Sequence, residues 1–263
     1  MNELASLWIG DTLSGIEQLS AASFLAQGNR LTIYTYEAVR GIPDGVDVAD
    51  ANEVFPCERI LRYPQNGSPA LHSNLFRYAL LQKTDKIWVD LDMVALRPFD
   101  FAGDHVFGLE AAGEINSAVL RLPKASPALQ KLARFRPDSI GYPPFTSFKK
   151  GLKWYLRTFG LRQPIERWPW GSTGPRALTH YLRQTGEIKH ALPRAAFFPF
   201  SWRELDRMLE PGAVSLSDLD ETTYGVHLWG KFLHQHIAGK YGGEIPPGSL
   251  IDQMFVRYRD GKK

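Results

Sequence analysis

The first 36 residues constrain the fold more than any other part of the chain. Residues 6–10 form a short apolar run that ends at a glycine. Ser14 and Glu17 then have the spacing of a helix-capping box, and apolar residues recur at helical intervals as far as Gly28. Residues 30–36 alternate in polarity, as a strand does. This order predicts two parallel strands joined by a right-handed crossover helix, and therefore an α/β fold.

The composition is that of a globular protein. The chain has 263 residues, of which 44% are hydrophobic and 22% charged, which excludes wholesale disorder and a coiled coil. We find no apolar run long enough to span a membrane and no secretory signal, and the single cysteine excludes an internal disulfide and a cysteine metal site. We therefore expect a cytoplasmic protein. A net charge of +3 gives no reason to expect nucleic-acid binding.

The rest of the chain continues with helices and short strands, without internal repeats or an evident linker. Residues 41–70 have an irregular pattern rich in proline and glycine, and residues 137–170 show no clear pattern. The remaining segments predict helices over 71–83, 126–135 and 176–184, and strands over 87–89, 117–120 and 224–229. These elements favour one domain.

The strongest chemical signal is the hydrophobic strand that runs into Asp90-Leu91-Asp92. In an extended segment alternate side chains point the same way, so Asp90 and Asp92 should share a face. Two close carboxylates repel each other unless a cation lies between them, and a hard divalent ion suits this arrangement. The alternative is an ordinary strand end, where aspartate is common.

A second signal lies in the late strand, where His227 and Trp229 should share a face by the same alternation. An imidazole is a suitable ligand for Mn²⁺. The alternative is a core histidine in an aromatic strand. Glycines on both sides of this segment permit a close approach of the backbone.

Three further segments carry polar or basic residues in suggestive patterns. Ser73, Asn74 and Arg77 share a helix face just before the acidic strand, although a solvated face would look the same. The loop 170–175 has the glycines and hydroxyls of a binding loop at a helix start, or of a plain capped turn. The basic, aromatic stretch 148–155 fits a membrane surface or an anionic glycan, or a solvated helix face.

Taken in order, these segments resemble glycosyltransferase family 32, the DxD-containing α-1,4-galactosyltransferase-like and mannosyltransferase-like enzymes. The resemblance includes the first strand–helix–strand unit, the segment 73–94, the G-P-x-x-L-T-like segment 174–179 and the H-x-W at 227–229. It covers most of residues 5–230.

The resemblance implies a fold and a reaction. The fold is a single GT-A domain over 1–263 with a mixed central sheet, in which 1–100 form a Rossmann-like nucleotide-sugar-binding half. Residues 101–263 form the acceptor-side half, with a C-terminal metal-ligand strand. The reaction is transfer of a sugar, with retention of configuration, from a nucleotide-sugar donor to a glycan or lipid-linked glycan. The donor is expected to be a UDP-sugar and the cofactor Mn²⁺ or Mg²⁺.

The resemblance also implies site residues. The metal ligands are expected to be Asp90, Asp92 and His227. The catalytic residues are expected to be Asp90, Asp92 and Asn116, with Glu110 and Glu114 beside the donor sugar. Donor contacts are expected from residues in the family motifs, from residues at strand ends beside the expected binding crevice, and from a basic residue. These are Trp8, Tyr34, Tyr36, Ser73, Asn74, Arg77, Asp90, Trp229 and Lys231. Acceptor contacts are expected from Trp170, Ser172 and Thr173.

Two departures from the family pattern leave alternatives open. Asn74 stands where the family carries an aspartate, which bears on the donor sugar, and residues 83–86 replace a frequent Gly-Gly pair. A haloacid-dehalogenase-like phosphatase that uses Asp90 and Asp92 is one alternative, although its usual later acidic motif is missing from the sequence. A catalytically inactive module that binds UDP-sugars is another.

Overall fold

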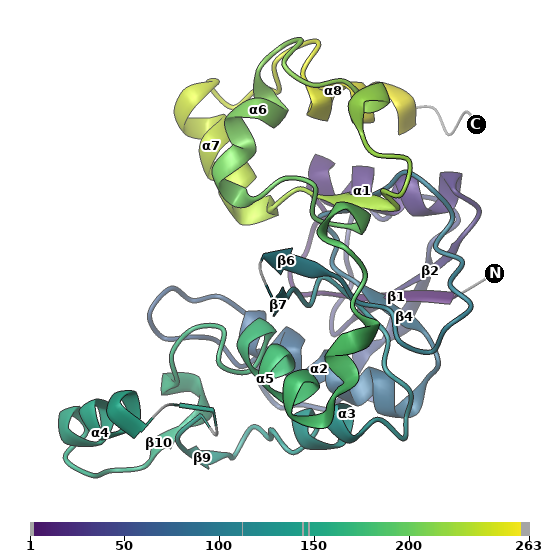
Figure 1. Ribbon diagram of the computed structural model, residues 1–263. Helices are drawn as coiled ribbons and strands as arrows, with labels where there is room; N and C mark the ends of the chain where they lie inside the picture. Colours follow the sequence, from purple (N-terminus) through teal and green to yellow (C-terminus); the bar gives the residue numbers. More distant parts are fainter. Residues whose placement is uncertain (1–2, 112, 144, 147, 259–263) are drawn as a thin grey trace.

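A computed structural model describes residues 3–111, 113–143, 145–146 and 148–258. Its centre is a five-stranded sheet with the strand order β3-β2-β1-β4-β8 (Figure 1). The sheet strands are β1 (Glu3–Trp8), β2 (Arg30–Thr35), β3 (Asp47–Asp50), β4 (Ile87–Val89) and β8 (Val119–Leu120). The first four are parallel to one another, and β8 is antiparallel to β4. The predicted α/β fold with a mixed central sheet is confirmed.

The N-terminal strand–helix–strand unit forms as predicted. Helix α1 (Gly15–Ala26) connects β1 to β2, and a capping box between Ser14 and Glu17 begins it. Gly28 follows the helix with φ of 77°, in the left-handed region that glycine adopts without strain. Strand β1 lies a few residues earlier than predicted, because its pairing with both β2 and β4 extends it toward the N-terminus.

Two predictions for irregular regions were incomplete. Residues 41–70 include β3, a short and largely exposed strand at the edge of the sheet with an aspartate at each end. Residues 137–170 contain β9 (Ile140–Gly141), α4 (Phe148–Arg157) and β10 (Gln163–Pro164). Figure 1 shows these three elements at the lower left, away from the central sheet. The side chains of Phe148, Lys150 and Trp154, part of the predicted stretch 148–155, lie outside the described structure.

The remaining elements surround the sheet and frame its carboxyl edge. The helices predicted over 71–83, 126–135 and 176–184 form, with small differences at their ends. These and the other elements are α2 (Ala70–Lys83), α3 (Pro127–Leu132), α5 (Pro175–Thr185), α6 (Leu205–Leu209), α7 (Gly230–Lys240), α8 (Leu250–Tyr258), β5 (Met93–Ala95), β6 (Leu109–Ala111), β7 (Glu114–Ile115) and β11 (Gly225–His227). β11 is shorter than the predicted strand 224–229, because Trp229 turns into the left-handed region with φ of 57°.

The hydrophobic core is shared by distant parts of the sequence. One buried cluster brings Leu4 and Val89 of the sheet together with Phe197 and Phe198. The division into a nucleotide-sugar-binding half over 1–100 and an acceptor-side half over 101–263 stays a prediction. None of the helices in the described residues has both the length and the apolar composition to cross a membrane.

Candidate metal and donor site

The acidic segment follows β4 as a turn. Asp90 donates its backbone N–H to the carbonyl of Ala118, 2.8 Å away on the antiparallel side of the sheet. Met93 then donates its N–H to the Asp90 carbonyl at 3.1 Å, and the chain reverses into β5. The predicted extended geometry, with alternating side chains, is therefore wrong for Asp90-Leu91-Asp92. The two carboxylates approach a common point because the backbone turns.

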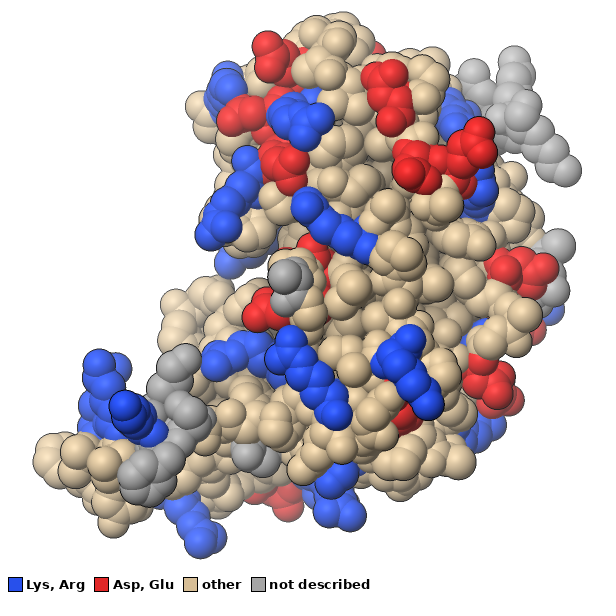
Figure 2. Space-filling view, in the orientation of Figure 1, with Lys and Arg blue, Asp and Glu red and all other residues tan. Residues whose placement is uncertain are grey.

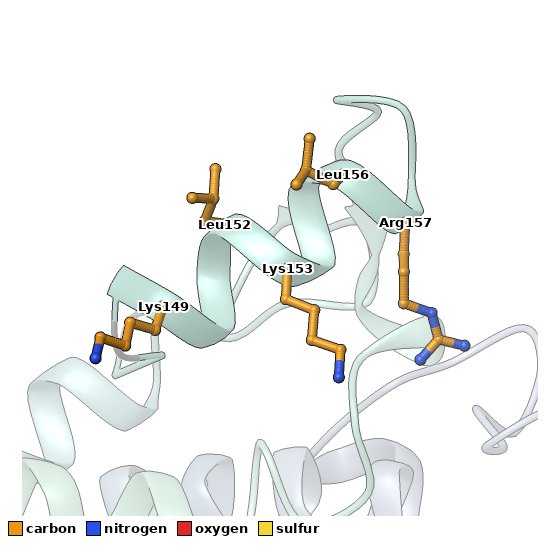
Figure 3. A pocket seen from close by; sticks show the side chains of 5 residues that line it. All are labelled: Lys149, Leu152, Lys153, Leu156 and Arg157. Carbon is orange, nitrogen blue, oxygen red and sulfur yellow. The ribbon is translucent and has the colours of Figure 1, made fainter.

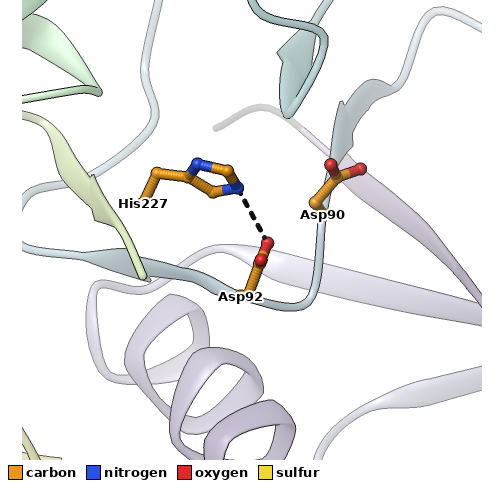
Figure 4. A group of neighbouring side chains, drawn as sticks. All are labelled: Asp90, Asp92 and His227. Atoms are coloured by element: carbon orange, nitrogen blue, oxygen red, sulfur yellow. Dashed lines mark ion pairs between the residues drawn. The ribbon is translucent and has the colours of Figure 1, made fainter. Parts of the chain in front are cut away.

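His227 reaches Asp92 through the pairing of β5 with β11. In this antiparallel pair His227 lies opposite Met93, the residue after Asp92. Its Nε2 lies 3.1 Å from Asp92 Oδ1 (Figure 4). The other carboxylate oxygen, Oδ2, accepts a hydrogen bond of 2.7 Å from the N–H of Gly230, the first residue of α7. Asp92 is thus held from two sides by the segment 227–230.

His227 and Trp229 lie side by side, as expected, but for a different reason. Their ring centroids are 4.3 Å apart, in an edge-to-face contact. Trp229 is outside the strand and adopts a left-handed conformation at the start of α7, so strand alternation does not explain the contact. The Trp229 indole N–H donates to the carbonyl of Phe200 at 3.1 Å, which fixes the ring.

Asp90 is oriented by two donors on the same carboxylate oxygen. Its Oδ1 accepts from Arg77 Nη2 and from the indole N–H of Trp88, both at 2.6 Å. The Arg77 guanidinium also lies 4.5 Å from the centre of the Trp88 ring. Trp88 was not among the predicted site residues. It lies on β4, two residues before Asp90, and this spacing could have indicated that the two side chains lie on the same side.

The three side chains form a candidate metal site. Each of Asp90, Asp92 and His227 offers a ligand atom, and these atoms all lie within 4.8 Å of one another. Within the described chain Asp90 Oδ2 accepts no hydrogen bond, since both of its carboxylate's donors reach Oδ1. Two carboxylates and one imidazole suit Mn²⁺, and the carboxylates suit Mg²⁺. The donor set therefore fits the predicted cation.

The three groups shift one another's protonation. Burial and the nearby Asp92 raise the pKa of Asp90, although Arg77 opposes them. Burial would also raise the pKa of Asp92, but His227 and the Gly230 N–H outweigh it, so this pKa is lowered. Burial lowers the pKa of His227, but the carboxylates outweigh it and the net pKa is raised. The cluster therefore favours a charged Asp92–His227 pair.

A buried hydrogen-bonded chain connects the acidic site to the loop 170–175. Asn74 accepts from Arg77 at 3.4 Å and donates to the Thr173 hydroxyl at 3.2 Å. Tyr78 donates to the Thr173 carbonyl at 2.7 Å, and the Tyr63 hydroxyl lies 3.2 Å from the Thr173 hydroxyl. The order of contacts is thus Thr173, Asn74, Arg77, Asp90. No sequence signal pointed to the two tyrosines.

The predicted acceptor loop divides into exposed and buried parts. Trp170 is 59% exposed, whereas Ser172 and Thr173 are fully buried. The Ser172 hydroxyl finds no hydrogen-bond partner in the described structure. In this conformation Trp170 is in contact with solvent, whereas Ser172 and Thr173 are not. Their contact with an acceptor stays a prediction.

The predicted donor residues on the first two strands have partners inside the protein. Trp8 packs against the core and Tyr34 is buried against Phe76, with ring centroids 5.5 Å apart. The Tyr36 hydroxyl donates to the carbonyl of Phe55 at 2.7 Å and lies 2.8 Å from the ring nitrogen of His72. The structure does not connect these three residues to the acidic site by any described hydrogen bond.

The remaining predicted residues lie on α2, on α7 and around β6 and β7. Ser73 is half-buried on α2, and Lys231 is exposed in the first turn of α7, next to Gly230. Asn116 donates to Glu110 at 2.8 Å and accepts from the N–H of Ala118, whose carbonyl binds Asp90. Glu110 also lines a hollow of about 260 Å³, together with Glu114, Arg176, His180 and Arg183.

Comparisons with known proteins were made at three levels. No protein-family model and no curated protein sequence matches the chain. Among solved structures, the PaToxG glycosyltransferase aligns with a TM-score of 0.45 and 13% identity, over 99% of this chain and 86% of its own. An active-site mutant of LgtC aligns with a TM-score of 0.35 and 14% identity, over 86% of each chain.

A third structure, the apo form of the bifunctional glycosyltransferase WbbM, aligns with a TM-score of 0.36 and 9% identity. The alignment covers 98% of this chain and 49% of WbbM. All three TM-scores lie below 0.5, so these similarities carry no argument about the activity of this chain.

Proposed function

We propose that the chain is a metal-dependent, retaining glycosyltransferase of the GT-A type, with a nucleotide-sugar donor, specifically a UDP-sugar, and a glycan or lipid-linked glycan acceptor. One observation carries the proposal: the ligand atoms of Asp90, Asp92 and His227 lie within 4.8 Å of one another. They do so beyond the carboxyl end of a mostly parallel sheet, where α/β proteins bind nucleotides.

In this proposal Asp90, Asp92 and His227 hold Mn²⁺ or Mg²⁺. When bound, the cation supplies a Lewis acid that stabilises negative charge on the leaving diphosphate. The protein orients the ligands: Arg77 and Trp88 fix Asp90, and the Gly230 N–H fixes Asp92.

The start of α7 adds positive potential beside the same carboxylates. Backbone N–H groups at a helix N-terminus favour negative charge, and the Gly230 N–H already binds the Asp92 carboxylate there. Lys231 is the next residue and its side chain is exposed. We assign Lys231 to the diphosphate of the donor, where a fixed cation stabilises the developing charge.

Asn74 acts as a positioning residue. Its amide donates to Thr173 and accepts from Arg77, and the side chain is buried. Both ends of the amide are therefore used within the protein, so its effect on the donor passes through Arg77 and Asp90. Asn116, which lies between β7 and β8, donates to Glu110 of β6, and we assign both residues to the donor-sugar side.

The phosphatase alternative requires a carboxylate that attacks phosphorus. The equivalent carboxylate here, Asp90, accepts two short hydrogen bonds from Arg77 and Trp88 on one oxygen. These donors stabilise the carboxylate as a fixed anion and reduce its nucleophilicity. This contact favours a role in orientation over a role in covalent catalysis.

A panel of UDP- and GDP-sugars tests the proposal. We expect nucleotide release from one donor class in the presence of Mn²⁺ and no release in the presence of a chelator. Phosphate release from simple phosphoesters would instead support the phosphatase. Metal-dependent UDP binding without turnover of any sugar nucleotide would support the inactive binding module.

A further inference from the structure

The segment around α4 has an unusual charge. Between residues 139 and 165 the sequence contains five basic residues and no acidic one. The five are Lys149, Lys150, Lys153, Arg157 and Arg162. The net charge of the whole chain is only +3, so the rest of the molecule carries a small net negative charge. We refer to residues 139–165, as far as they are described, as the α4 lobe.

The α4 lobe also concentrates exposed apolar side chains. Across the described residues, large hydrophobic side chains are strongly exposed at eleven positions, and six of these lie in this lobe. The six are Ile140, Leu152, Tyr155, Leu156, Phe159 and Leu161. Such a concentration on one small projection is typical of a contact surface, not of scattered surface residues.

The two kinds of side chain lie on adjoining faces of α4. Leu152 and Leu156 are one helical turn apart, and together with Lys149, Lys153 and Arg157 they line one hollow of about 570 Å³ on the helix surface (Figure 3). Lys149 lies next to the apolar face near the beginning of the helix. Figure 2 shows basic side chains gathered on the same projection. A helix with an apolar stripe beside a basic stripe is suited to the interface of a membrane.

The turn after α4 exposes a phenylalanine at a strained position. Phe159 has φ of 50°, in the left-handed region where glycine is preferred at a helix end, and its side chain is 91% exposed. Folding alone gains nothing from an exposed aromatic ring in this conformation. An aromatic side chain that inserts at the level of lipid headgroups does explain it.

We propose that the α4 lobe docks on the surface of a lipid bilayer that contains anionic lipids. Leu152, Leu156 and Phe159 enter the headgroup region, and Lys149, Lys153 and Arg157 contact lipid phosphates. Charge complementarity favours this occupant, since the lobe is basic throughout and has no acidic residue to bind a basic partner. The helix has ten residues, about 15 Å, so it lies on a bilayer without crossing it. Docking of this kind does not require the proposed glycosyltransferase activity.

Vesicle flotation of the full chain tests the proposal. We expect binding to phosphatidylcholine vesicles that contain about one third phosphatidylglycerol, weak binding to phosphatidylcholine alone, and loss of binding at high salt. The double substitution Leu156→Ser with Arg157→Glu should weaken binding at least about tenfold. The matched control is Val256→Ser with Arg257→Glu on α8, which lies at the far end of the molecule in Figure 1.

Phe159→Gly separates docking from folding. Glycine suits the backbone conformation at this position, so the variant should melt at the same temperature or higher. Its binding to anionic vesicles should nevertheless be several-fold weaker.

Three results would overturn the proposal. Equal vesicle binding by the α4 and α8 double variants would show that the lobe is not the contact. Binding of the chain to a soluble anionic polysaccharide with none to vesicles would assign the basic face to a glycan. Self-association that the α4 double variant abolishes, again without vesicle binding, would assign the apolar face to a second copy of the chain.

Discussion

The acidic site and the α4 lobe show opposite ways to place charge in one molecule. At the acidic site each charged side chain has a counter-charge within the fold: Asp90 has Arg77 and Asp92 has His227. In the α4 lobe five basic side chains share a segment without a single acidic residue, beside exposed apolar side chains.

The charges of the acidic site are balanced within the fold, whereas those of the α4 lobe are left for a binding partner to balance. The acidic site is held by the strand register of β5 and β11, a helix N-terminus and a buried arginine, so substitutions there should alter both stability and binding. In the α4 lobe Leu152, Leu156 and Phe159 are exposed, so substitutions of these residues should alter association and leave the fold unchanged.

Asp92→Ala should have the largest effect. It removes one proposed metal ligand and leaves His227 and the Gly230 N–H without their partner. We expect metal-dependent turnover of the nucleotide-sugar to fall by more than about a hundredfold. The assay is nucleotide release in the presence of Mn²⁺. Asp206→Ala, which removes an exposed carboxylate on α6, is the control; a similar loss in both variants would contradict the assignment.

Arg77→Met should destabilise the fold. The substitution leaves Asp90 without its cation, and the arginine side chain is 4% exposed while the aspartate is 31% exposed. Because water still reaches Asp90, we expect a loss of about 2 kcal/mol in the free energy of unfolding, less than for a fully buried pair. Denaturant titration measures it.

Arg30→Met provides the comparison, since both Arg30 and its partner Asp47 are more than half exposed. We expect about 0.5 kcal/mol or less for this surface pair. Equal losses for the two substitutions would show that Arg77 has no special role in holding Asp90.

Metal affinity should depend on pH through His227. Its pKa is raised, since the carboxylates outweigh burial, and a protonated imidazole cannot bind a metal. Mn²⁺ affinity should therefore fall about tenfold for each pH unit below this raised pKa. Titration calorimetry over a range of pH values measures it, and His227→Gln should make the affinity less dependent on pH.

The stability of the metal-free protein should change with pH in the opposite direction to the Mn²⁺ affinity. The change falls between the ordinary pKa of histidine and the raised pKa of His227. A raised histidine pKa contributes stability that is fully present below its ordinary pKa and is lost as the pH rises through the folded value. The lowered pKa of Asp92 contributes stability above the ordinary carboxyl pKa, which is lost as the pH falls through its folded value. A thermal melting profile without metal that rises steadily above neutral pH would contradict this.

Gly230→Ala should have a small, local effect. A Cβ at this position would lie 3.2 Å from the Cβ and from Oδ2 of Asp92, so the carboxylate must shift slightly. We expect Mn²⁺ affinity to fall by a few-fold. The control is Gly239→Ala in the same helix, where a Cβ has no neighbour within 4 Å and alanine favours the helix. If both variants bind Mn²⁺ equally well, the Gly230 contact does not position Asp92.

Leu156→Ser should have the smallest effect on the fold. The side chain is 64% exposed, so we expect a change of no more than about 0.5 kcal/mol in the free energy of unfolding. Turnover with a water-soluble acceptor should equal that of the unchanged chain. A marked loss of stability would show that the α4 lobe has internal partners and would remove the contrast with the acidic site.

Local patterns in the sequence were sufficient to predict much of the fold. The capping box at Ser14 and the period of α2 depend on residues close together in sequence, and both form as predicted. Strand β3 was missed because it has only four residues, two of them aspartates, and it becomes a strand through pairing with β2.

The sequence was sufficient to predict which residues form the candidate site, but not how the backbone brings them together. Asp90, Asp92 and His227 do converge, but through a turn and a strand pairing that join positions far apart in the sequence. Trp88 could have been found from its spacing to Asp90. The support of Thr173 by Tyr63 and Tyr78 could not, because nothing local indicates which side chains meet across the core.

Binding of Mn²⁺ in the presence of UDP is the sharpest test of the proposed metal site formed by Asp90, Asp92 and His227. Titration calorimetry of the unchanged chain, Asp92→Asn and Asp206→Asn compares the proposed ligand with an exposed carboxylate. We expect the unchanged chain and Asp206→Asn each to bind one Mn²⁺ with UDP, and Asp92→Asn to show a large loss of Mn²⁺ affinity. Mn²⁺ binding of equal affinity in all three proteins, or none in the unchanged chain with UDP present, would contradict this expectation.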